Sequence, residues 1–104
     1  IVASKHPKNY VHVVFNNGAH DSVGGQPTVG LKIDLPSVAK SVGYKETYSV
    51  DNMGKLKSIL PSIAKAEGPV FLQVCVKKGN RKDLGRPTTT PIQNKEALMK
   101  FLEK

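Results

Sequence analysis

The sequence has few of the features that mark secreted or membrane proteins. Its 104 residues include one cysteine, Cys75, and no tryptophan. A single cysteine cannot form an internal disulfide, which favours a cytoplasmic location. No apolar run approaches the roughly 18 residues of a transmembrane span, and no secretory signal opens the chain. The sequence therefore predicts a cytoplasmic protein with no membrane partner.

Negative charge and aromatic side chains are also scarce. Eight acidic residues oppose sixteen Lys and Arg, so the formal net charge is +8, and aromatic residues make up 6%. Basic domains often bind nucleic acid. Here most lysines are scattered along predicted helix surfaces and loops, and no nucleic-acid-binding signature appears. We therefore do not favour a nucleic-acid partner. A basic α/β module for nucleic acid or acidic partners remains the alternative from another functional class.

Three apolar runs predict β-strands, at residues 10–15, 44–50 and 70–76. The last run is apolar at nearly every position, which is typical of a strand covered on both faces of a parallel sheet. Helical patterns lie between the runs and after the last one. Such alternation predicts an α/β fold, with a parallel sheet and flanking helices.

Capping residues and apolar spacing predict three helices. Asp34 is expected to cap the first, and Asp51 or Asn52 the second. Pro61 is expected to bend or break the second helix, because proline removes a helical hydrogen bond. The third is predicted to open at Asn94 and to pack through Ala97, Leu98, Phe101 and Leu102.

Residues 16–30, the asparagine loop, follow the first predicted strand and are rich in amides, hydroxyls and glycine. Asn17-Gly18 is a sequence that forms type I′ hairpins. However, the next ten residues contain one large apolar side chain, Val23, so we expect no hairpin strand. In open α/β sheets, ligands bind beyond the carboxyl ends of the strands. The asparagine loop is therefore predicted to bind a ligand.

Residues 77–91, the basic segment, follow the third predicted strand as a loop. Five of the first ten residues are basic, and Asp83 is the single acidic one. Two interpretations remain open: the segment recognises an anion, or it is a solvated run of charges that gain little from pairing.

Two strings in these loops resemble a known family. A buried strand followed by Asn16-Asn17-Gly18 is similar to the closing half of the thiamine-diphosphate motif in the 2-oxo-acid decarboxylase superfamily. That motif opens with Gly-Asp-Gly, which is absent here. The strings from Phe15 to Gly30 and from Lys77 to Pro91 resemble the phosphonopyruvate decarboxylases in particular. The resemblance covers nearly the whole chain.

The resemblance implies that residues 1–104 form one partial domain, the C-terminal half of a Rossmann-like thiamine-diphosphate-binding domain. The missing upstream domain and a homo-oligomeric partner are then expected. The complete enzyme would be a carboxy-lyase that uses thiamine diphosphate and Mg²⁺ to convert phosphonopyruvate to phosphonoacetaldehyde and carbon dioxide. Sulfopyruvate or another 2-oxo acid with an anionic head group is the alternative substrate. The 104-residue chain alone is predicted to be inactive.

The resemblance also implies roles for residues of the asparagine loop. In the superfamily the second asparagine and a backbone carbonyl two residues later bind magnesium, which corresponds to Asn17 and Ala19. His20 and Asp21 are candidates for catalytic roles, although Asp21 is also suited to ordering the loop. A purely structural role for the paired asparagines remains the alternative. The predicted cofactor-binding residues are Asn16, Asn17, Gly18, Ala19, His20 and Ser22.

The basic segment is then the candidate site for the substrate's phosphonate. A planar guanidinium can bind two phosphonate oxygens at once. The predicted substrate-binding residues are therefore Arg81 and Arg86, followed by Lys82.

Overall fold

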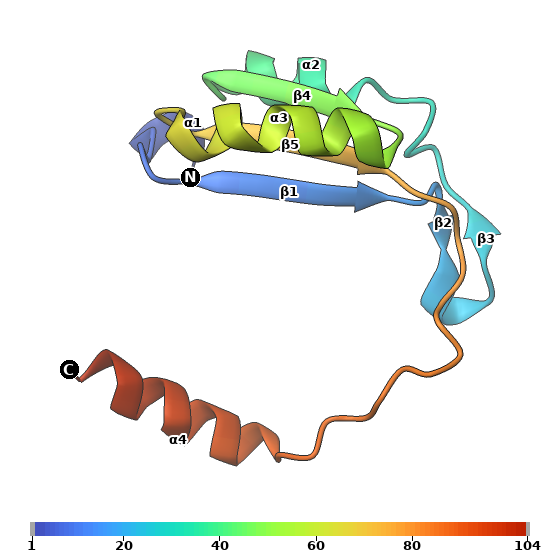
Figure 1. Ribbon diagram of the computed structural model, residues 1–104, viewed down its shortest axis with the longest axis vertical. Coiled ribbons are helices and arrows are strands. Elements are labelled where there is room, and N and C mark those ends of the chain that lie inside the picture. Colours follow the sequence, from blue (N-terminus) through green and yellow to red (C-terminus); the bar gives the residue numbers. More distant parts are fainter. Residues whose placement is uncertain (1, 104) are drawn as a thin grey trace.

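The computed structural model describes residues 2–103, except the side chain of residue 3. Helices and strands alternate along most of the chain (Figure 1). The elements are α1 (Val2–Lys5), β1 (Val11–Asn16), β2 (Ala19–His20), η1 (Asp21–Val23, a 3₁₀ helix), β3 (Gln26–Pro27), α2 (Leu35–Ser41), β4 (Glu46–Val50), α3 (Met53–Lys65), β5 (Val70–Cys75) and α4 (Pro91–Leu102).

Within residues 2–103, the main sheet has three strands in the order β1-β5-β4. Both neighbours run parallel to β5, and Val70 is in register with Val11 on one side and Glu46 on the other. Residues 70–74 of β5 are all buried, as predicted for a strand covered on both faces of the sheet. The predicted α/β fold with a parallel sheet is therefore confirmed, and it is consistent with half of a Rossmann-like thiamine-diphosphate-binding domain.

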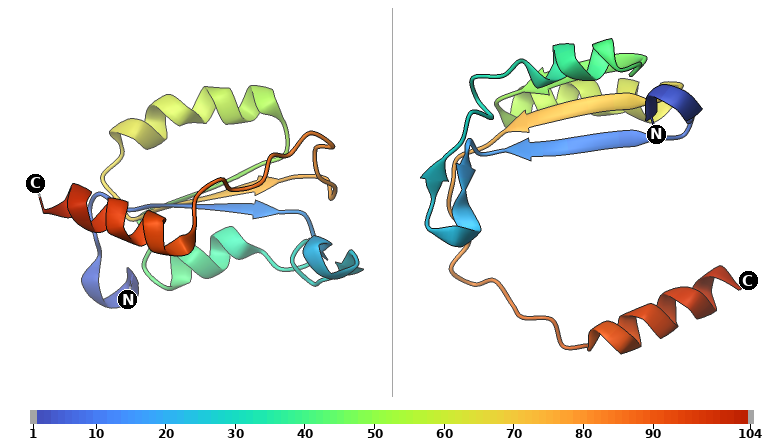
Figure 2. Two further views of the ribbon diagram at one scale, coloured as in Figure 1. Left: turned by 90° about the horizontal axis from the view of Figure 1, so that it is seen from below. Right: turned by 180° about the vertical axis from the view of Figure 1, so that it is seen from behind.

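Helices cover both faces of this sheet, with α3 on one side and α2 on the other (Figure 2). Because side chains alternate along a strand, Leu72 and Val74 pack with Ile63 of α3. Phe71 points to the opposite face and packs with Ala39 and Tyr44. The hydrophobic core thus lies on both faces of β5.

A line of polar side chains crosses the sheet near its carboxyl end. Asn16 Nδ2 donates to Gln73 Oε1 over 3.2 Å, and Gln73 Nε2 donates to Ser49 Oγ over 3.0 Å. These bonds join all three strands and satisfy the buried Gln73 amide. Gln73 Nε2 also lies 3.4 Å from the sulfur of the half-buried Cys75.

Strand β1 is the least covered strand of the sheet. Val11 and Phe15 are 44% and 69% exposed, and both point to the α3 face. On the α2 face, His12 Nδ1 lies 2.8 Å from the Tyr44 hydroxyl, as expected for a packed and hydrogen-bonded histidine. The sheet therefore leaves apolar surface uncovered beside the free edge of β1.

The helix caps agree with the sequence, but one expected break does not occur. Asp34 accepts a hydrogen bond from Ser37 N, and Asn52 accepts one from Lys55 N. Pro61 was expected to bend or break the second helix, and the break does not occur, because α3 continues to Lys65. Ile63 is buried in the core two residues after Pro61, and this packing holds the last turn in helical form.

Helix α4 departs from the sequence prediction in two ways. It begins at Pro91, three residues before Asn94, because Thr90 and Gln93 form a capping box. Its predicted packed face is wrong, since every residue of α4 is exposed. Figures 1 and 2 show α4 apart from the sheet, on the side of β1 away from β5. Within residues 2–103, no helix has the length and apolarity needed to cross a membrane.

Candidate functional site

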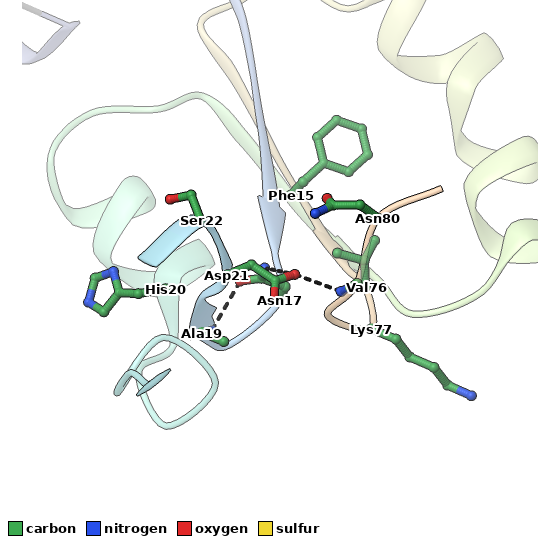
Figure 3. Close-up of a pocket in the computed structure, with 10 residues that line it drawn as sticks. Phe15, Asn17, Ala19, His20, Asp21, Ser22, Val76, Lys77 and Asn80 are labelled. Atoms are coloured by element: carbon green, nitrogen blue, oxygen red, sulfur yellow. Dashed lines mark hydrogen bonds between the residues drawn. The ribbon is translucent and has the colours of Figure 1, made fainter. Parts of the chain in front are cut away.

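A hollow of about 440 Å³ lies at the carboxyl ends of β1 and β5 (Figure 3). Parallel strands end at the same edge of a sheet, so the loops after β1 and β5 meet there although they are about 60 residues apart. The residues that line the hollow are Phe15, Asn17, Ala19, His20, Asp21, Ser22, Val76, Lys77, Gly79 and Asn80.

The side chain of Asn16 holds the two ends of the asparagine loop together. Its side chain donates through Nδ2 to the Gly30 carbonyl over 2.8 Å, and its Oδ1 accepts from Gly18 N over 3.1 Å. Asn16 is 7% exposed and lies outside the lining of the hollow. Its amide thus joins the two ends of the loop.

The loop contains a short antiparallel pair that the sequence did not predict. In the described residues β1 forms no hairpin with the segment after Gly18, as predicted, but β2 pairs with β3 inside the loop. Gly18 makes the turn into β2 with a φ of 65°, a backbone conformation that favours glycine. Gly18 itself lies outside the lining of the hollow.

Two oxygens predicted to bind magnesium lie in this loop. Asn17 Oδ1 accepts a hydrogen bond from Ala19 N over 3.0 Å, which uses one of its two lone pairs. Ala19 is opposite Pro27 at a non-hydrogen-bonded position of the β2–β3 pair, because the adjacent bond runs from Thr28 N to the Gly18 carbonyl, so the pairing does not use the Ala19 carbonyl. Both oxygens therefore retain the capacity to bind a cation.

Three further predicted residues of the asparagine loop, His20, Asp21 and Ser22, also line the hollow. His20 is exposed, and Figure 3 shows its ring extending away from the Asn17 amide. Ser22 lies in the 3₁₀ helix that follows. Asp21 Oδ2 accepts a hydrogen bond of 2.6 Å from Gly79 N, in the basic segment. The structure thus brings four of the six predicted cofactor-binding residues and both catalytic candidates to one hollow.

The basic segment contributes different residues from those predicted. Lys77, Gly79 and Asn80 line the hollow, whereas Arg81, Lys82 and Arg86 lie outside its lining. All of these side chains are exposed, and Arg81 Nε lies 3.4 Å from Asp83 Oδ1. Sequence reasoning missed Gly79 and Asn80. Their position shortly after the third predicted strand is the signal that could have identified them.

The donor set fits part of a magnesium–diphosphate site. Magnesium prefers oxygen ligands such as an amide oxygen and a backbone carbonyl, which Asn17 and Ala19 offer. In residues 2–103, no group of three or more His, Cys, Asp or Glu side chains is placed to hold a metal ion.

Comparison with known proteins identifies relatives of the chain. No protein-family model matches it. A phosphonopyruvate decarboxylase from Streptomyces viridochromogenes is 36% identical over 92 residues, which cover 88% of this chain and 23% of that protein. One from Streptomyces hygroscopicus is 36% identical over 100 residues, covering 96% of this chain and 25% of that protein. The resemblance to the phosphonopyruvate decarboxylases is confirmed.

A more distant relative carries a related name. A sulfopyruvate decarboxylase from Methanosarcina acetivorans is 28% identical over 103 residues, covering 98% of this chain and 26% of that protein. The chain thus spans about a quarter of the length of these curated relatives. All three names describe decarboxylases of 2-oxo acids with an anionic head group.

Proposed function

We propose that this chain is part of a decarboxylase that uses thiamine diphosphate and Mg²⁺ to convert phosphonopyruvate to phosphonoacetaldehyde and carbon dioxide. One observation carries the proposal. The two strings that resemble phosphonopyruvate decarboxylases, far apart in the sequence, meet at one polar hollow at the carboxyl edge of a parallel sheet. That edge is where α/β proteins bind their ligands.

In this proposal the asparagine loop holds the metal and the diphosphate. Asn17 Oδ1 and the Ala19 carbonyl bind Mg²⁺, and Asn16 keeps the loop in the required shape. His20 and Ser22 offer an imidazole and a hydroxyl to the diphosphate oxygens from the same wall of the hollow. Bound thiamine diphosphate would supply the electron sink for decarboxylation. This chain's residues then bind and orient the cofactor.

The basic segment is proposed to recognise the anionic head group of the substrate. Lys77 already lines the hollow, whereas Arg81 and Arg86 lie farther along the segment. Direct contact of these arginines with substrate therefore requires the segment to close over the hollow. Sulfopyruvate is the alternative substrate, because its sulfonate offers oxygens of similar geometry.

We further propose that an upstream half-domain packs beside β1 and beneath α4. Among the described residues, the outer edge of β1 has no neighbouring strand, and α4 lies beyond that edge (Figure 1). Phe15 on β1 and Phe101 on α4 are 69% and 68% exposed. Covering these apolar surfaces would stabilise both elements. A second copy of the protein is the proposed oligomeric partner.

The test of the proposal is calorimetric titration of the whole protein containing this chain with thiamine diphosphate and Mg²⁺, followed by an aldehyde assay with phosphonopyruvate. Magnesium-dependent cofactor binding and aldehyde formation are expected. The 104 residues alone should bind poorly and form no aldehyde. A whole protein that binds no cofactor, yet is retained on heparin at low salt, would instead support the basic binding module.

Replacement of Asn17 sharpens this test. Asn17→Ala removes an amide oxygen from the metal, so we expect magnesium-dependent affinity for thiamine diphosphate to fall by about tenfold or more. Circular dichroism should remain unchanged. Asn9→Ala is the matched control, because Asn9 lies in another hollow, near the start of β1. Equal affinities of the Asn17→Ala variant and the wild type would contradict the metal assignment.

A further inference from the structure

Asp21 makes a direct bond between the two loops of the hollow. Its Oδ2 accepts from Gly79 N over 2.6 Å, between residues 58 positions apart in the sequence. A carboxylate that accepts from a backbone N–H forms a stronger bond than two neutral groups do. Close by, Lys78 Nζ donates to the Gly25 carbonyl over 3.3 Å. The start of the basic segment is therefore tied to the asparagine loop.

The same carboxylate oxygen also faces Asn17. Asn17 Nδ2 lies 3.5 Å from Asp21 Oδ2, a long contact that places the amide nitrogen toward the carboxylate. The amide oxygen then points to the other side, where it accepts from Ala19 N. Asp21 thus lies between the proposed metal ligand and the first turn of the basic segment.

Gly79 has a backbone suited to this bond. Its φ is 120°, which side-chain-bearing residues rarely adopt, and no atom beyond Gly79 and its two chain neighbours lies within 4 Å of where a Cβ would stand. Glycine is thus required by the backbone conformation and not by lack of space. The conformation allows the chain to turn so that Gly79 N points to Asp21.

From this geometry we infer that Asp21 is a positioning residue that fixes the basic segment against the asparagine loop and orients the Asn17 amide. Its action is as a hydrogen-bond acceptor and not as a proton carrier. The inference rests on the proposed function for its kinetic consequence, since the two loops are the proposed magnesium and substrate loops.

The experiment compares Asp21→Ala with Asp21→Asn in the whole protein that contains this chain. Asparagine keeps an oxygen that can accept from Gly79 N, whereas alanine has none. Amide hydrogen exchange at Gly79 reports directly on its hydrogen bond to Asp21. Tryptic cleavage after Lys77 and Lys78 reports on how firmly the start of the basic segment is held. We expect Asp21→Ala to speed both by about tenfold, and Asp21→Asn to stay near wild type. Asp51→Ala is the matched control, because Asp51 also follows a strand at this sheet edge but bonds to Asn52 and Lys55.

Kinetics with phosphonopyruvate, thiamine diphosphate and Mg²⁺ complete the test. Asp21→Asn should restore most of the kcat/KM that Asp21→Ala loses. Equal loss in both variants, with Gly79 exchange still protected in Asp21→Asn, would overturn the inference in favour of a role for the charge itself. Unchanged exchange in Asp21→Ala would overturn it as well. The exchange measurement needs no activity, so failure of the decarboxylase proposal is seen separately, as a wild type that forms no aldehyde.

Discussion

The body of the molecule, residues 11–76, and the C-terminal arm, residues 77–103, place similar apolar side chains in opposite environments. In the body, Leu72 is 2% exposed between strands and beneath α3. In the arm, Leu98 is 58% exposed on a helix whose residues all face solvent. Both leucines belong to regular elements, a strand and a helix, that the local sequence predicts. The two side chains differ in whether the rest of this chain buries them.

This difference shows that a local sequence pattern can start a helix without providing the packing that stabilises it. Thr90, Pro91 and Gln93 start α4 with a capping box and a proline at the first turn. A helix of 12 residues is nevertheless marginal in water without packing. The proposed contact of α4 with protein outside these 104 residues would supply that packing.

The largest expected effect comes from truncating a leucine in each region. Leu72→Ala leaves a cavity in the core, so the free energy of unfolding should fall by about 3 kcal/mol. Leu98→Ala in the same chain should change it by less than about 0.5 kcal/mol, because the side chain is exposed. Urea denaturation followed by circular dichroism measures both.

The whole protein offers a sharper form of the same comparison. If another part of the protein covers α4, Leu98→Ala should there cost about 2 kcal/mol or more. A cost below about 0.5 kcal/mol in the whole protein as well would contradict the proposed contact of α4 with the upstream half-domain.

The fold could largely be predicted from sequence, because apolar runs and helix caps are local features of the sequence. The alternation of strands and helices along the chain then indicates the parallel sheet. The apolar run from residue 70 identified a central strand, and Asp34 and Asn52 identified helix starts. The continuation of α3 and the exposure of α4 depend on tertiary contacts, which the local sequence does not reveal. Packing of Ile63 carries α3 through Pro61, and no local pattern revealed that α4 lacks a partner in this chain.

The residues of the candidate site that follow β1 could be predicted from the sequence. The contacts between the loop after β1 and the loop after β5 could not. Asn17 and Ala19 were named from the resemblance, and both line the hollow. The bond from Gly79 N to Asp21 joins residues far apart in sequence, so composition and spacing contain no sign of it. The buried role of Asn16 likewise depends on Gly30 and Gln73, which fold against it from distant positions.

A second prediction asks whether the arm contributes to substrate binding. In the whole protein, Arg81→Ala and Arg86→Ala should each raise KM for phosphonopyruvate about tenfold, since each removes the proposed charge-assisted bond to the phosphonate. KM for pyruvate, which lacks that group, should stay nearly constant. Steady-state kinetics on both substrates measure the difference.

Lys95→Ala is the matched control, because Lys95 is an exposed cation on α4 of the same arm. Arg81→Lys keeps the charge but loses the planar fork, so its KM should fall between those of Arg81→Ala and wild type. Equal losses with phosphonopyruvate and pyruvate would show general damage to the site and would contradict head-group recognition.

The smallest expected effect concerns two sets of ion pairs. Glu67 pairs with lysines from distant segments, whereas Asp83 in the arm pairs with Arg81 two residues away. Glu67 accepts hydrogen bonds from Lys45 at 2.7 Å and pairs with Lys8 at 3.0 Å, and these lysines lower the pKa of Glu67 from 4.5 to about 2. The folded state therefore binds a proton less readily than the unfolded chain. The stabilisation is complete above about pH 4.5 and is lost as the pH falls toward 2.

Glu67→Gln tests this contribution. Its Tm should lie slightly below that of wild type at pH 7, and the gap should close as the pH is lowered toward 2. The effect is small because all three side chains are at least half exposed, and 1 M salt should reduce it further. Asp83→Asn is the control in the arm, where the pair with Arg81 spans two residues and joins no separate elements. A gap in Tm between wild type and Glu67→Gln that is the same at pH 7 and pH 2.5 would show that the Glu67 charge does not stabilise the fold.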